Sequence, residues 1–130
     1  TESGDYDDCC LSQIHHSKTS LHLDDEGFCT VLDGNRVIRA SPSGRIKLTL
    51  AVPAARPGHS SIRCRDGVCA VSFVMEKGTP MALLFRDDGA VLFTKRFPSE
   101  SFLDASLEGE LLLLRGSDHL FCYGIRRPGP

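Results

Sequence analysis

The sequence contains no tryptophan, and aromatic residues make up only 7% of its 130 positions. It has no apolar run near the ~20 residues that a membrane-spanning helix needs, so we expect no membrane insertion. The net charge is only −2, with 15 basic and 17 acidic residues mixed along the chain. Nucleic-acid binders usually carry a basic stripe, so this charge balance argues against a nucleic-acid partner.

Several chemical signatures are also missing. The sequence has no Gly-x-Ser-x-Gly elbow, no phosphate-binding P-loop and no dinucleotide fingerprint. Its only asparagine, Asn35, precedes Arg36, so it has no N-glycosylation signal. His59, Ser60 and Ser61 sit beside a Pro-Gly pair and are interpreted as a solvated loop. The sequence therefore predicts a protein that is not an enzyme and uses neither a cofactor nor a metal.

What the sequence does contain is a series of short apolar runs separated by turn residues. Residues 45–50 alternate apolar and polar, which predicts a strand with one buried face, whereas residues 68–75 are apolar on both faces. The predicted strands are 20–23, 28–32, 36–40, 45–52, 60–64, 68–75, 81–85, 90–97, 110–115 and 119–125.

Glycine, proline, aspartate and asparagine recur about every ten residues between these runs. This cadence predicts an all-β fold, an antiparallel β-sandwich, with a β-trefoil or another closed barrel as the alternative. We expect one domain over residues 1–130, with loose ends at residues 1–8 and 126–130. The best helical candidate is residues 99–105, where Ser99 is a possible N-cap, and we expect one helical turn there at most.

Acidic-Gly-apolar units recur at residues 25–28, 65–68 and 87–90. Such a repeat is found in trefoils and propellers, but three hairpin turns that use the same chemistry are the favoured interpretation. Acidic clusters at residues 24–26 and 87–88, together with the Glu108/Glu110 pair, are interpreted as solvated turns rather than as a calcium site.

An Asp-Gly pair lies between Cys64 and Cys69. A two-residue turn there places the two cysteines on facing strands of a hairpin, at a separation that a disulfide bridges. A structural disulfide is therefore favoured over two buried thiols or a redox or metal pair.

Two adjacent cysteines, Cys9 and Cys10, precede the His15-His16 pair. The spacing does not match a zinc site, because adjacent residues do not readily bind one ion. A disulfide from Cys9 or Cys10 to Cys29 or Cys122 is preferred.

The longest segment without strand character, residues 52–59, contains two prolines. Its polar residues Arg56 and His59 make it a candidate recognition loop, since binding residues often lie on loops of a rigid scaffold. A plain connection between sheets is the alternative.

The order of features from Cys29 to Cys64 resembles that of a known family. A Pro-Ser-Gly turn at residues 42–44 precedes a Leu-Thr-Leu strand at 48–50, and an Arg-Pro-Gly loop follows at 56–58. This order is similar to the N-terminal CUB-like domain of the meteorin family of secreted factors. The sequence departs from that family in lacking its tryptophan and in having adjacent N-terminal cysteines.

The resemblance implies a CUB-like or jelly-roll-like β-sandwich, secretion, a receptor as partner and a Cys29–Cys64 disulfide. Together with the even cysteine count and the β cadence, it leads us to expect a secreted ligand or receptor-binding module held by disulfides. The alternative is an intracellular β-rich interaction or scaffold domain with reduced cysteines. Both interpretations expect a protein partner.

Overall fold

The computed structural model describes residues 19–125, which form eleven β-strands and no helix. The expected loose ends and the Cys9-Cys10 and His15-His16 pairs all lie outside this range. No helix of the described residues is long and apolar enough to cross a membrane. The strands are β1 (Thr19–Leu23), β2 (Cys29–Asp33), β3 (Arg36–Ala40), β4 (Ile46–Ala51), β5 (Ala55–Arg65), β6 (Val68–Met75), β7 (Pro80–Arg86), β8 (Val91–Arg96), β9 (Leu103–Glu108), β10 (Leu111–Gly116) and β11 (Leu120–Gly124).

These strands form three antiparallel sheets, each made of strands that follow one another in the chain. Sheet 1 has the order β1-β2-β3-β4, sheet 2 the order β5-β6-β7-β8, and sheet 3 the order β9-β10-β11. The described sheets do not close into a barrel, so the trefoil and barrel alternatives are wrong. The all-β fold of antiparallel sheets is consistent with the predicted β-sandwich. Because every pairing is a local hairpin, short turns alone set the order of strands.

Sheet 2 is the middle layer. One of its faces packs against sheet 1 through Phe73 and Phe85, which are fully buried. Its other face packs against Leu103 and Leu114 of sheet 3. All eight residues of β6 are buried, as its apolar sequence on both faces predicted.

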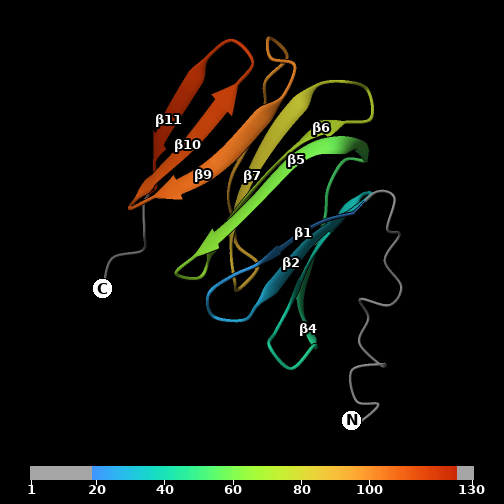
Figure 1. Cartoon of the computed structure of the whole chain (residues 1–130), viewed down its shortest axis with the longest axis vertical. Coiled ribbons are helices and arrows are strands. Elements are labelled where there is room, and N and C mark those ends of the chain that lie inside the picture. The colour runs from blue at the N-terminus through green and yellow to red at the C-terminus, as the bar shows by residue number, and fades with distance from the viewer. Residues whose placement is uncertain (1–18, 126–130) are drawn as a thin grey trace.

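The first strands of the three sheets lie beside one another. β5 contacts both β1 and β9, and Figure 1 shows β5 (green) and β9 (orange) running side by side. β9 was not expected: residues 99–105 were predicted to hold a helical turn. Instead Glu100 N donates to Phe97 O in a turn, and the chain enters β9 at Leu103. The alternation of Leu103, Ala105 and Leu107, all buried against sheet 2, outweighs the N-cap signal of Ser99.

The three acidic-Gly units are hairpin turns, as favoured from the sequence. They connect β1 to β2, β5 to β6, and β7 to β8. In the second unit Asp66 and Gly67 have φ values of 52° and 77°, the left-handed pair that a two-residue hairpin turn needs.

This turn places Cys64 opposite Cys69, with their Cα atoms 4.1 Å apart, and the two are disulfide-bonded as predicted. Loop closure over so short a segment stabilises the folded state by roughly 2 kcal/mol. The Cys29–Cys64 pairing implied by the family resemblance is therefore wrong, because Cys64 is bonded to Cys69.

The remaining described cysteines lie on different sheets. Cys122 on β11 carries a free, exposed thiol, so a bridge from Cys9 or Cys10 to Cys122 is not formed. Cys29 is the first residue of β2, and a bridge from it to Cys9 or Cys10 falls outside the described residues.

Candidate functional site

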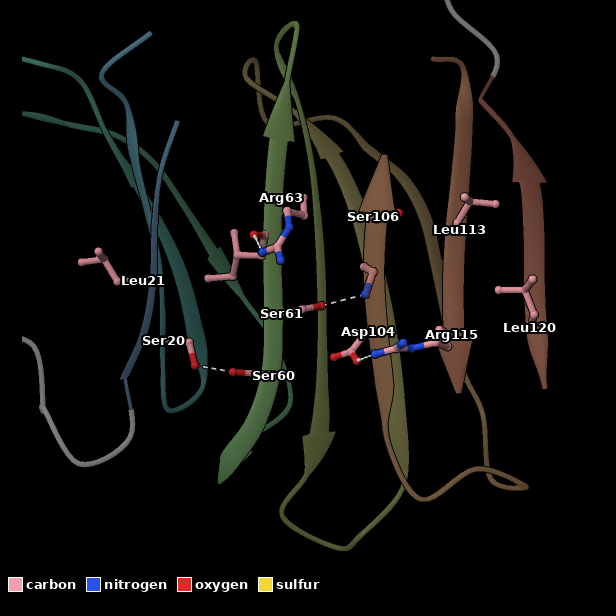
Figure 2. A pocket seen from close by; sticks show the side chains of 12 residues that line it. Ser20, Leu21, Ser60, Ser61, Arg63, Asp104, Ser106, Leu113, Arg115 and Leu120 are labelled. Atoms are coloured by element: carbon pink, nitrogen blue, oxygen red, sulfur yellow. Dashed lines mark hydrogen bonds and ion pairs between the residues drawn. The ribbon is translucent and has the colours of Figure 1, made fainter. Parts of the chain in front are cut away.

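A groove of about 540 Å³ runs along the side of the molecule where the first strands meet. We call it the inner-strand groove. Figure 2 shows side chains from β1, β5 and β9 along it, with β10 and β11 at one edge. Its lining residues are Ser20, Leu21, Ser60, Ser61, Ile62, Arg63, Asp104, Ala105, Ser106, Leu113, Arg115 and Leu120.

A chain of hydrogen bonds fixes the wall between β5 and β9. The backbone N–H of Ala105 donates to Ser61 Oγ (2.7 Å), and Ser61 and Ser72 share a 2.5 Å hydroxyl contact. Ser72 Oγ in turn donates to Leu103 O (2.9 Å), so Ser61 must donate to Ser72. These buried hydroxyls link sheets 2 and 3, between which no strands are paired. Each hydroxyl proton is already donated to a hydrogen bond within the protein. Ser20 and Ser60 make a similar hydroxyl contact between β1 and β5.

Asp104 holds the charged cluster at one end of the groove. Its carboxylate accepts from Arg115 Nη2 (3.0 Å) and contacts His59 Nε2 (2.9 Å). Burial raises the pKa of Asp104, but the hydrogen bonds from Arg115 and His59 outweigh burial and leave that pKa below its usual value. Asp104 is therefore ionised at neutral pH and orients the side chains of both Arg115 and His59.

Arg63 differs from Arg115 in its partners. Its Nη1 donates to Ile62 O (2.8 Å), and no carboxylate of residues 19–125 lies within ion-pair distance of its guanidinium. A guanidinium has five N–H donors, so most of those on Arg63 face the groove or solvent without an acceptor among the described residues. Arg63 is the cation in the groove that has room for an anionic ligand.

Apolar side chains flank these charges. Leu21 on β1 is 63% exposed and Leu120 on β11 is 70% exposed, on opposite sides of the groove. Leu113 lies on β10, the strand between β9, which carries Asp104, and β11, which carries Leu120 (Figure 2). An exposed apolar rim around a polar centre is typical of protein-interaction surfaces.

The two residues of the predicted recognition loop do not share one site. Residues 55–59 belong to β5, which begins earlier than predicted, with an irregularity between Ala55 and Ser60. Arg56 points to the β6–β7 turn, where its Nη2 lies 3.5 Å from Glu76 O. His59 instead packs on Phe102, with ring centroids 4.6 Å apart, and reaches the groove through Asp104.

Two of the acidic clusters converge away from the groove, on Arg39. The Arg39 side chain is 1% exposed; its Nη2 lies 3.1 Å from Asp24 Oδ2 and its Nε lies 2.6 Å from Asp87 Oδ1. Nη1 donates to Thr30 Oγ1 (2.9 Å), and the guanidinium lies 4.6 Å from the centroid of the Phe28 ring. The solvated-turn interpretation is therefore wrong for Asp24 and Asp87, which join sheets 1 and 2 through a buried arginine.

A second structural carboxylate, Glu100, lies in the loop between β8 and β9 and accepts hydrogen bonds from the loop between β10 and β11. Its side chain is buried and accepts from the N–H groups of Asp118 (2.8 Å) and His119 (3.1 Å), and from His119 Nδ1 (2.7 Å). The hydrogen bond from the His119 ring, with those from the backbone, lowers the pKa of Glu100 to about 2. The same hydrogen bond to Glu100 raises the pKa of His119.

Within residues 19–125, no group of three or more histidine, cysteine, aspartate or glutamate side chains is placed to hold a metal ion. A scan against models of protein families and a search of curated proteins found no match to the chain.

Proposed function

We propose that the protein is a non-catalytic binding module that holds an extended segment of a protein partner in the inner-strand groove. One observation carries this proposal: Arg63 presents a guanidinium without a carboxylate partner among the described residues, between the exposed side chains of Leu21 and Leu120. A segment with a carboxylate for Arg63 and apolar residues for the rim satisfies both features. Such charge-assisted contacts select the register, and apolar contacts supply affinity.

The walls of the groove support binding because they are already ordered. The hydroxyl chain through Ser61 and Ser72 and the contacts of Asp104 with Arg115 and His59 fix both sides of the groove before a ligand arrives. A preformed site loses less conformational entropy when a ligand binds. The groove residues sit on strands rather than on loops, which gives them well-defined positions.

Replacing Arg63 with glutamate tests this proposal. The probe is a fluorescein-labelled six-residue peptide of alternating leucine and aspartate, measured by fluorescence anisotropy. The R63E variant is expected to weaken binding at least tenfold, about 1.4 kcal/mol, because a charge-assisted contact becomes a repulsion.

The matched control is R96E, at an exposed arginine on β8 outside the groove, which is expected to leave affinity unchanged. A peptide of alternating leucine and arginine is expected not to bind the wild-type protein. Equal affinities for the two peptides, or equal losses in R63E and R96E, would contradict the proposal.

We extend the proposal to the compartment: a secreted ligand or receptor-binding module. The Cys64–Cys69 disulfide supports it, because disulfides persist chiefly in oxidising compartments. In protein from its native source, alkylation before reduction is expected to label Cys122 and to leave Cys64 and Cys69 unlabelled. Peptide mapping by mass spectrometry reads each position.

Labelling of Cys64 and Cys69 without reduction would favour the second candidate, an intracellular interaction or scaffold domain. The free thiol of Cys122 is the observation that fits this alternative, since exposed free cysteines are uncommon in oxidising compartments. The groove proposal holds in either compartment, because neither Arg63 nor Asp104 depends on cysteine chemistry.

A further inference from the structure

Within residues 19–125, sheet 3 has one strand fewer than the other two sheets, and comparison with sheets 1 and 2 shows which strand position is unfilled. β5 lies against β1 and β2 of the sheet before it, and β9 lies in the same way against β5 and β6. β9 therefore corresponds to the first strand of a sheet, and β11 to the third. The position after β11, which β4 fills in sheet 1 and β8 fills in sheet 2, is empty among the described residues.

The backbone of β11 is open at this position. β11 pairs only with β10 in the described structure, and the flanking hydrogen bonds, Gly116 N to His119 O and Ile125 N to Glu110 O, fix which residues face β10. Since facing residues alternate along an antiparallel pair, the N–H and C=O groups of Leu120, Cys122 and Gly124 point outward.

An apolar pocket of about 410 Å³ lies beside this edge, between sheets 2 and 3. Leu92 and Phe93 of β8 line one side of it, and Tyr123 of β11 lines the other, with the Phe93 and Tyr123 rings 4.8 Å apart. In the equivalent position of sheet 1, the fourth strand β4 places Leu48 and Leu50 against sheet 2.

The composition of the edge strands supports the same conclusion. Proteins protect exposed sheet edges with charged residues, and β4 carries Lys47 while β8 carries Lys95 and Arg96. The sequence of β11, Leu-Phe-Cys-Tyr-Gly, contains no charged residue. An edge without charge beside an apolar pocket is a surface to which another strand can add.

We infer that the outer edge of β11 binds an extended segment of a partner protein, which adds as the fourth strand of sheet 3. The segment alternates polar residues with apolar ones, as β4 does, and its apolar side chains enter the pocket between β8 and β11. This site differs from the inner-strand groove: Leu120 belongs to both, but Cys122, Gly124 and the pocket residues Leu92 and Tyr123 do not line the groove.

The test uses a fluorescein-labelled peptide with the sequence of β4, Ile-Lys-Leu-Thr-Leu-Ala, which carries no acidic residue for Arg63. Saturable binding to the wild-type protein is expected. Cys122→Pro is expected to weaken it about tenfold or more, because proline removes an outward N–H and blocks the edge without changing the hydrogen bonds to β10. Cys122→Ser, which keeps that N–H, is the matched control and is expected to bind like the wild type.

A second pair of variants tests the pocket independently of the β11 backbone. Leu92→Lys, which places a charge in the pocket, is expected to weaken binding, whereas Leu111→Lys, at a similarly exposed leucine outside it, is not. A peptide N-methylated on alternate residues is expected not to bind. Failure of the unmodified peptide to bind, or equal binding by the Cys122→Pro and Cys122→Ser variants, would overturn the inference.

Light scattering on the peptide-free protein tests whether a second copy of the chain, rather than a partner protein, binds this edge. A monomer at the concentrations of the assay is expected. A dimer that Cys122→Pro dissociates would overturn the inference in favour of a second copy of the chain. R63E is expected to leave binding of this peptide unchanged. The experiments therefore test binding at the β11 edge separately from binding in the inner-strand groove.

Discussion

Replacing Arg39 with methionine is expected to lower the free energy of unfolding by about 3–5 kcal/mol, the range for a broken buried ion pair. Methionine fills similar space but leaves the carboxylate of Asp24, which is 5% exposed, without its cationic partner. Asp87 loses its 2.6 Å contact to Arg39 and keeps only Lys47, at 3.5 Å. Urea unfolding followed by circular dichroism measures the effect.

The matched control is Arg86→Met at the end of β7. Arg86 is 32% exposed and pairs with Asp88, which is 58% exposed, so its loss leaves no buried charge and is expected to lower the free energy of unfolding far less than Arg39→Met does. A third protein carries Arg39→Met together with Asp24→Asn and Asp87→Asn. Because it removes the uncompensated charges, it is expected to recover part of the lost stability. Equal losses in the Arg86 and Arg39 single variants would show that the Arg39 network contributes little to stability.

Local features of the sequence were enough to predict most of the strands. The boundaries of β3 and β6 match the prediction, because a Gly-Asn turn and an Asp-Gly turn mark where these strands begin. The disulfide between Cys64 and Cys69 was predictable for the same reason: a two-residue turn fixes the register of the hairpin. In these cases the determining contacts lie within about ten residues of each other.

β9 was missed because two local signals compete in the same segment. Ser99 suggested a helix start, while Leu103, Ala105 and Leu107 alternate with polar residues as in a half-buried strand. Packing of those three residues against sheet 2 decides the outcome, and that packing involves residues far away in the sequence.

The groove and the Arg39 network depend on how the sheets stack, which no local pattern encodes. Arg63 and Asp104 are far apart in the chain and line one groove only because β5 and β9 lie side by side. Asp24 and Asp87 looked like ordinary turn residues, since their shared partner Arg39 comes from a third segment. Strand patterns predicted antiparallel sheets packed on one another, but neither the division into three sheets nor which strands of different sheets meet.

Replacing Gly116 with alanine is expected to lower the free energy of unfolding by about 1–3 kcal/mol, as overpacking of a filled site does. A Cβ at this position clashes with Glu100 Oε1 and lies 2.8 Å from Glu100 Cδ. The carboxylate cannot simply move aside, because its hydrogen bonds to Asp118 and His119 hold it in place. Gly124→Ala on the neighbouring strand is the control, since a Cβ there meets nothing within 4 Å.

The pH dependence of this effect shows whether Glu100 is the group displaced. The pKa of Glu100 is about 2 in the folded protein, below its value in the unfolded chain, so its stabilising contribution is present above pH ~4.5 and is lost as the pH falls towards 2. The pKa of His119 is raised by its hydrogen bond to Glu100, so its contribution is present below pH ~6.5 and is lost as the pH rises through the raised value. The difference in stability between the wild type and Gly116→Ala is therefore expected to be largest between about pH 4.5 and 6.5 and to shrink on the acid side. Gly124→Ala is expected to differ from the wild type by the same small amount at every pH, and a pH-independent loss in Gly116→Ala would place the clash on a group other than the Glu100 carboxylate.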